Sequence, residues 1–247
     1  MSLSRRSFFA NLAATAGLPA LAADKKAALR PNIILLAVDN LASWMLGING
    51  NRDIRTPNLD TLVRAGMRFN LAYSASPTAT AGLPALLSGR TARQLGDGKK
   101  PLDSEVLLSD ILSAQGYTCG YAGRWAGADA TRPGHGYGFS SADPAVALNF
   151  ISQQKPTKPF FLTLSYPLLS TTPAPQYAAL YSQATFVESL PRHTTAANAT
   201  AKDKLKEILP HIRHAAAAIS SLDDQVGAIV KALRAAAVRD NTLIILT

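Results

Sequence analysis

Short, continuous apolar runs recur along this chain and alternate with stretches of helical periodicity. Ile33–Val38, Phe160–Leu164 and Thr242–Leu246 are such runs, each short enough for a strand and apolar enough to be buried on both faces. Val106–Ala114 and Ile212–Ala236 carry apolar residues at helical spacing. Strands that alternate with helices are typical of βαβ units. The sequence therefore predicts an α/β fold whose sheet is mostly parallel and is flanked by helices on both faces.

Weaker signals predict the remaining regular elements. A helix is expected from residue 57 or 58 to Gly66, and Phe69–Tyr73 and Tyr117–Ala122 have the apolar character of strands. Leu83–Leu87 is too short to indicate a helix by periodicity, although Pro84 suits a first helical turn.

Three segments rich in glycine, proline or polar residues are predicted to be connections. They are Trp125–Asp143, Leu168–Gln183 and Pro191–Ala201. The first is expected to lie over the carboxyl ends of the strands, where open α/β sheets place their ligands. His135, in the sequence GHGYGF, is the histidine near the predicted mouth of the site, whereas His193, His211 and His214 lie in segments without a motif match. All four are interpreted as exposed or structurally satisfied.

The N-terminus has the three-part pattern of an export signal. Arg5 and Arg6 form a twin-arginine pair, Ala10–Leu18 is modestly apolar, and Ala20–Ala22 offers an Ala-x-Ala cleavage site. Residues 1–22 are therefore predicted to be a twin-arginine signal peptide, and the protein is expected in the periplasm or outside the cell. Residues 30–247 are predicted to form the folded domain.

Composition narrows the partner classes. The formal net charge is +9, or +7 without Arg5 and Arg6, which favours sulfated or other polyanionic ligands. The basic residues are scattered and no nucleic-acid motif accompanies them, so nucleic acid is not an expected partner. No apolar run reaches the roughly 20 residues of a membrane span. Cys119 is the only cysteine, which excludes an intramolecular disulfide and favours a small buried residue. The oligomeric state is left open.

The segment Tyr73–Arg90, YSASPTATAGLPALLSGR, resembles the nucleophile segment of the sulfatases, within the alkaline-phosphatase superfamily. That family has Cys-x-Pro-Ser-Arg followed by a helix that ends in Leu-Leu-(Thr/Ser)-Gly-Arg. Alignment on Leu86–Arg90 places Ala79 at the cysteine that matures to formylglycine and Leu83 at the motif arginine. An alanine methyl group cannot become an aldehyde hydrate, so no formylglycine is possible at Ala79.

The resemblance extends along most of residues 30–247. Five further segments match family motifs in order: Arg30–Asn40, Thr56–Phe69, Leu108–Trp125, Pro159–Tyr166 and Ile219–Thr247. It implies an alkaline-phosphatase/sulfatase-like fold, sulfuric ester hydrolysis as the family reaction, and Ca²⁺ as the metal.

Several positions depart from the family's site. Asp39 matches the first carboxylate of the metal-binding Asp-Asp pair, and Asn40 replaces the second with an amide. Arg124 stands in place of the Gly-Lys-Trp-His lysine, and Ala126 in place of its histidine. The family's later Asp-Asn has no counterpart before the chain ends at Thr247, which predicts an incomplete domain with uncovered apolar surface and a tendency to self-associate. Asp39 and Asn40 are thus the candidate metal ligands, yet too few for a tight Ca²⁺ site.

Three functions follow from these residues. The first is an exported sulfatase-like protein that is catalytically impaired in this form, as a truncated remnant or a pseudoenzyme. The second is an active sulfate or phosphate ester hydrolase that uses Thr80 or Thr78, which flank Ala79, as nucleophile, with Arg124 holding the anion. The third is a binder of sulfated small molecules or glycans that does not cleave them. Whether the chain is an enzyme is left open, because most catalytic positions are substituted or absent.

Overall fold

A computed structural model describes residues 30–96, 102–125, 135–141, 143–186 and 199–247, with the side chains of residues 103 and 199–205 excepted. The predicted signal peptide, Ala126 and His193 lie outside these residues. Within the described residues, no helix is both long and apolar enough to cross a membrane.

The described strands form one parallel sheet in the order β3-β2-β4-β1-β5. The strands are β1 (Asn32–Val38), β2 (Thr118–Gly123), β3 (Phe139–Ser141), β4 (Phe160–Tyr166) and β5 (Thr242–Leu246). The helices are α2 (Pro57–Arg64), α3 (Ala79–Ser88), α4 (Leu108–Ala114), α5 (Val146–Ser152), α6 (Pro175–Tyr181) and α7 (Ala199–Ala235). Short 3₁₀ turns lie at 43–45, 47–49, 102–104, 168–170 and 239–241.

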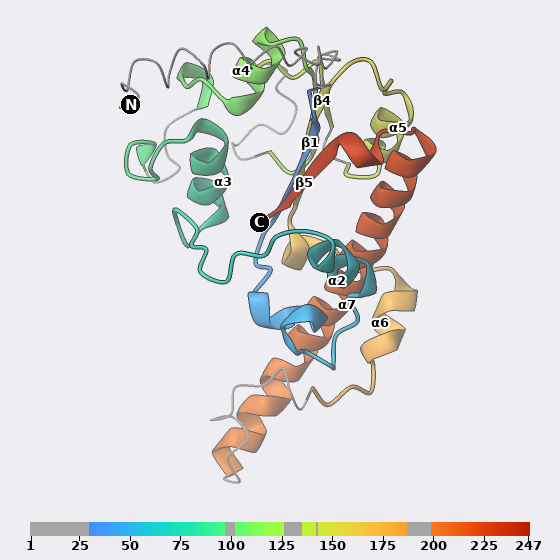
Figure 1. Cartoon of the computed structure of the whole chain (residues 1–247). Coiled ribbons are helices and arrows are strands. Elements are labelled where there is room, and N and C mark those ends of the chain that lie inside the picture. The colour runs from blue at the N-terminus through green and yellow to red at the C-terminus, as the bar shows by residue number, and fades with distance from the viewer. Residues whose placement is uncertain (1–29, 97–101, 126–134, 142, 187–198) are drawn as a thin grey trace, which may run out of the picture.

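Helices cover the sheet from both sides, as the sequence predicts (Figure 1). Alternate residues of the central strands point to opposite faces. Ile34 and Leu162 belong to a core cluster on the side of α5 and α7, whereas Leu35 and Phe161 belong to a second cluster that includes residues of α3. The two central strands are therefore buried on both faces, which explains their continuous apolar sequences.

Several expected boundaries are wrong. Phe69–Tyr73 forms no strand: no strand pairs with it, and an extended segment without hydrogen-bonding neighbours does not make a sheet. Pro84 lies inside α3 rather than in its first turn. Helix α7 begins at Ala199 and runs through Pro210, so it starts well before residue 212. All three segments predicted to be connections contain regular structure: the first contains β3, the second contains α6, and the third includes the start of α7.

Candidate functional site

The carboxyl ends of β1, β2 and β4 bring together residues that are far apart in the sequence. The Asp39 N–H, just after β1, donates to the Tyr166 carbonyl oxygen at 2.9 Å. The Arg124 N–H, just after β2, donates to the Ser165 carbonyl oxygen at 3.2 Å. One carboxylate and one guanidinium are therefore carried at the same edge of the sheet, where α/β folds place ligands.

Gly123 permits this approach of β2 to β4. Its φ is +105°, a left-handed value that residues with a Cβ rarely adopt, and an added Cβ would lie 1.9 Å from the Ser165 carbonyl oxygen. Only glycine fits here. The strand consequently ends with Arg124 beside the end of β4.

Asp39 lies partly buried at the end of β1. Burial raises the pKa of its carboxyl above the ordinary value of 3.8, and the positive charge of Arg124 opposes this shift. Asn40, the next residue, has φ +61° and so turns the chain sharply, which asparagine tolerates better than most residues.

A cavity of about 770 Å³ lies between residues 37–42 and residues 73–86. Five of the residues singled out from the sequence line it: Asp39, Asn40, Thr78, Ala79 and Leu83. Thr80 and Arg124 are not among the lining residues. Thr80 lies about 100° further around α3 than Ala79, which turns its side chain away from the position that Ala79 occupies. The structure thus places Thr78, rather than Thr80, in the same cavity as the candidate metal ligands.

Thr78 stands at the N-cap of α3 in an extended conformation, and its side chain makes no capping hydrogen bond. Its hydroxyl oxygen lies 3.2 Å from Ser76 Oγ and accepts a long hydrogen bond of 3.5 Å from the Thr80 hydroxyl. Its recorded hydrogen-bond partners are hydroxyl groups, which are not bases strong enough to activate a nucleophile.

Sequence reasoning gave no role to several other lining residues, among them Ser165, Leu169 and Thr247. Ser165 was detectable because it directly follows the predicted strand Phe160–Leu164, and the carboxyl ends of parallel strands meet at the edge of the sheet that binds ligands. Leu169 and Thr247 carry no chemical signal, and only the packing of the chain shows that they line the cavity.

Neither His135 nor Trp125 lines the cavity. Trp125 packs against the second core cluster, and His135 stacks on Trp125. The His135 Nδ1 lies 3.3 Å from Asp110 Oδ2, and its ring stacks on Trp125 with centroids 6.2 Å apart. Cys119 is buried in β2, and burial raises the pKa of its thiol to about 11, so it stays protonated at neutral pH. These residues stabilise the fold beside β2.

The residues present do not fit a complete calcium site. Among the described residues there is no group of three or more His, Cys, Asp or Glu side chains that could hold a metal ion. Asp39 and Asn40 supply one carboxylate and one amide oxygen, whereas Ca²⁺ takes 6–8 oxygen ligands.

Comparison with known proteins gives one family. The family model described as Sulfatase matches residues 31–144 and 140–247. Arylsulfatase A of Bos taurus is 41% identical over 116 residues, an alignment that covers 43% of this chain and 23% of the relative. The alignment thus spans less than a quarter of that curated relative.

Solved structures show the same fold over most of the chain. A protein bound to its substrate, D-glucosamine-2-N,6-O-disulfate, has a TM-score of 0.71 at 15% identity, covering 87% of this chain and 64% of that protein. The phosphonate monoester hydrolase of Agrobacterium radiobacter has a TM-score of 0.66 at 18% identity, covering 88% and 62%. At these identities the likeness is one of fold.

Proposed function

Because the chain belongs to the sulfatase family, we propose that it recognises sulfate esters but is impaired in their hydrolysis in this form. The observation that carries this proposal is Ala79. Its position lines the same cavity as Asp39 and Asn40, and its methyl group has no oxygen or sulfur atom that can attack an ester. The family's covalent route is therefore closed at this position.

In this proposal two positively charged features bind the sulfate group: the Arg124 side chain and the N-terminus of α3. Arg124 is not among the residues that line the cavity, but it follows β2 at the same edge of the sheet and its positive charge reaches Asp39. The first turn of α3 begins at the wall of the cavity. A guanidinium binds a sulfuryl group through two parallel hydrogen bonds, and the free N–H groups of a helix N-terminus add a positive dipole end.

The proposed ligand class is a sulfated sugar or an aryl sulfate. It is supported by relatives that include an arylsulfatase and a protein solved with a disulfated glucosamine, and by the net charge of +9. Periplasmic or extracellular placement, proposed from Arg5 and Arg6, would bring the chain into contact with such material.

Turnover and binding are tested separately. With an aryl sulfate and an aryl phosphate, in calcium or in a chelator, we expect rates at background. Calorimetry with a sulfated disaccharide at low salt should give binding that Arg124→Ala weakens by about tenfold and that 0.5 M salt abolishes. The matched control is Arg234→Ala, an exposed arginine of α7. No heat at low salt, or equal loss in both variants, contradicts sulfate recognition.

An active hydrolase that uses Thr78 is the second candidate, because this residue lines the cavity beside Ala79. If it operates, metal-dependent turnover of the aryl esters disappears in Thr78→Ala and persists in Thr80→Ala, whose hydroxyl lies outside the lining. Turnover that is unaffected by Thr78→Ala dismisses this candidate.

A further inference from the structure

The backbone of Arg124 is bound to the fold through both of its polar groups. Its N–H donates to the Ser165 carbonyl oxygen at 3.2 Å, and its carbonyl oxygen accepts a hydrogen bond from the Tyr121 hydroxyl. The two contacts come from neighbouring strands, since Ser165 belongs to β4 and Tyr121 to β2. The point at which the Arg124 side chain leaves the backbone is therefore fixed relative to the sheet.

Tyr121 reaches the Arg124 carbonyl only because the chain turns at Gly123. In a regular strand, residues three apart are separated by about 10 Å and point to opposite faces. The φ of +105° at Gly123 ends the strand and turns the Arg124 peptide back toward the phenol. The same glycine that lets β2 approach β4 thus also brings the Arg124 carbonyl within reach of the Tyr121 hydroxyl.

The Tyr121 side chain is itself held rigidly. It is 1% exposed, and its ring packs edge-on against Trp125 and Tyr137, with centroids 4.8 Å and 5.5 Å apart. Burial raises the pKa of its phenol, against a smaller opposing effect of a hydrogen bond to the Ser165 side chain. The phenol therefore stays protonated at neutral pH and remains a hydrogen-bond donor.

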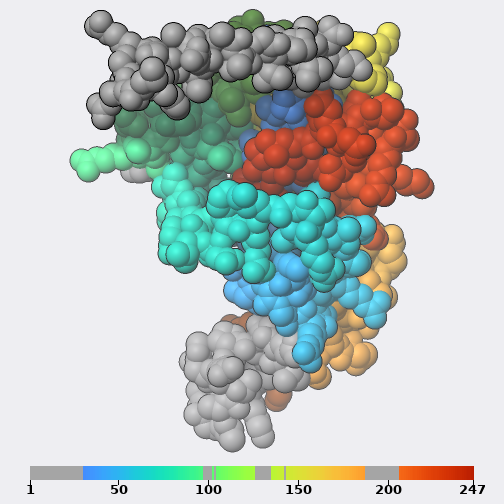
Figure 2. Space-filling view, viewed as in Figure 1, coloured from blue at the N-terminus to red at the C-terminus, as the bar shows by residue number. Residues whose placement is uncertain are grey.

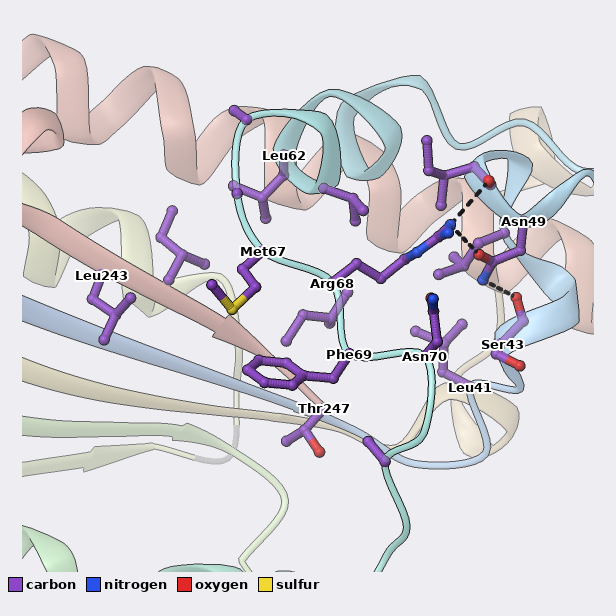
Figure 3. Close-up of a pocket in the computed structure, with 18 of the residues that line it drawn as sticks. Leu41, Ser43, Asn49, Leu62, Met67, Arg68, Phe69, Asn70, Leu243 and Thr247 are labelled. Carbon is purple, nitrogen blue, oxygen red and sulfur yellow. Dashed lines mark hydrogen bonds between the residues drawn. The ribbon is translucent and has the colours of Figure 1, made fainter.

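Arg68 shows a different way of holding an arginine. It lines the groove next to β5, where the cyan residues of this part of the chain lie against the red C-terminal residues (Figure 2). Its guanidinium donates a hydrogen bond to Asn49 Oδ1 at 2.8 Å (Figure 3). Arg68 is thus fixed through its side chain, whereas the contacts that fix the Arg124 peptide use none of the guanidinium donors.

We propose that Tyr121 is a positioning residue for anion binding: its hydroxyl orders the Arg124 peptide and so holds the base of that side chain at the edge of the sheet that carries Asp39. This inference rests on the proposed recognition of sulfate by Arg124. A backbone that is already ordered does not have to be ordered by the ligand, so the contact raises affinity without touching the anion.

Removal of one oxygen atom tests this role. Tyr121→Phe keeps the buried ring and removes the hydroxyl, and it should weaken binding of a sulfated disaccharide by about threefold in calorimetry at low salt. The matched control is Tyr137→Phe. It removes a hydroxyl from the same group of packed rings, but one that lies 2.9 Å from Thr163 Oγ1, and it should bind as the wild type does. Urea unfolding verifies that both variants fold.

A double-mutant cycle separates an effect through Arg124 from other effects of the substitution. Tyr121→Phe also removes the hydrogen bond to Ser165, which lines the cavity. If the hydroxyl acts through the guanidinium, Tyr121→Phe should cause no further loss of affinity in an Arg124→Ala background. A general loosening of the site, or an effect through Ser165, would weaken binding in that background as well.

Nuclear spin relaxation adds a measurement that needs no ligand. The order parameter of the Arg124 backbone N–H should be that of a rigid backbone, about 0.85, and should fall toward about 0.6 in Tyr121→Phe. It should stay unchanged in Tyr137→Phe.

The proposed function and the positioning role fail in different ways. If the wild-type protein does not bind the disaccharide, the proposed function fails, and unchanged order at Arg124 in Tyr121→Phe would overturn the positioning role independently. If the wild type binds, the positioning role is overturned by undiminished affinity of Tyr121→Phe, by equal losses in the two phenylalanine variants, or by an equally large loss in the Arg124→Ala background.

Discussion

At residue 123 the backbones of β2 and β4 come so close that the choice of amino acid decides where Arg124 lies. The same left-handed conformation occurs at Gly50, where φ is +98° and an added Cβ would meet nothing within 4 Å. An alanine at Gly50 would pay only for the left-handed backbone conformation, whereas an alanine at Gly123 would also clash with Ser165.

We therefore predict unequal losses from the same substitution. Gly50→Ala should lower the free energy of unfolding by about 1–2 kcal/mol, the cost of a left-handed alanine. Gly123→Ala should lower it by at least about 4 kcal/mol, because β2 must also move away from Ser165. Urea unfolding measures both. Similar values for the two variants would mean that the strands separate without difficulty.

Asp39 is predicted to reduce stability at neutral pH. Since its pKa is raised in the folded protein, the folded state binds the proton more readily than the unfolded chain, and the ionised carboxylate destabilises the fold above the folded pKa. Asp39→Asn should thus be more stable than the wild type at pH 7, and the difference should shrink as pH falls toward 3.8. Thermal melts across this range measure it, with the exposed Asp240→Asn as control. A difference that grows in acid would contradict the sign.

At the scale of elements, α7 holds α2 in place through one buried carboxylate. Asp223 of α7 is buried and accepts hydrogen bonds from the Asn58 N–H at 3.1 Å, the Asn58 side-chain amide at 2.8 Å and the Leu59 N–H at 2.8 Å. The two backbone N–H groups belong to the first turn of α2, where backbone N–H groups have no carbonyl partner within their own helix. An added Cβ at Gly227 would lie 2.7 Å from Asn58 Oδ1, so the glycine permits the close contact.

Removal of this carboxylate should be strongly destabilising. Asp223→Ala removes the partner of the buried Leu59 N–H and of the partly buried Asn58 N–H, and should lower the free energy of unfolding by about 3 kcal/mol. Its neighbour Asp224 is exposed and accepts a hydrogen bond from the Tyr177 hydroxyl, so Asp224→Ala should change stability by about 0.5 kcal/mol or less. Chemical denaturation compares the two. Equal effects would show that the contact with α2 contributes little.

Elements differ in how far the sequence predicts them. The strand at Thr242–Leu246 is predicted to the residue, and Ile33–Val38 to within one residue, because strands buried in a parallel sheet must be apolar throughout. Phe69–Tyr73 has the same apolar character, yet strand formation also requires a neighbour, which no local pattern reveals. The cap from Asp223 to α2 joins residues 165 positions apart and is equally invisible to local reasoning.

At the scale of the whole molecule, the candidate site was partly predictable. Asp39, Asn40 and Ala79 were identified from motifs and do lie along one cavity. Thr80 does not line the cavity because of the way α3 is oriented about its own axis. Ser165 lines it because β4 pairs with β1 and β2. Both are properties of the assembled fold.

Export remains a prediction of the N-terminal sequence. Residues 1–22 fused to a reporter should direct it to the periplasm through the twin-arginine route, and Arg5→Lys with Arg6→Lys should retain it in the cytoplasm. Fractionation of cells measures this. Export that survives both substitutions would contradict the assignment.

Thr247 lines the cavity that contains Asp39. Its carbonyl oxygen accepts a hydrogen bond from the Val38 N–H at 2.8 Å, and Val38 directly precedes that carboxylate. This hydrogen bond ties the position of Asp39 to the end of β5. A substitution that displaces this end of the strand should therefore also displace the carboxylate at the cavity wall.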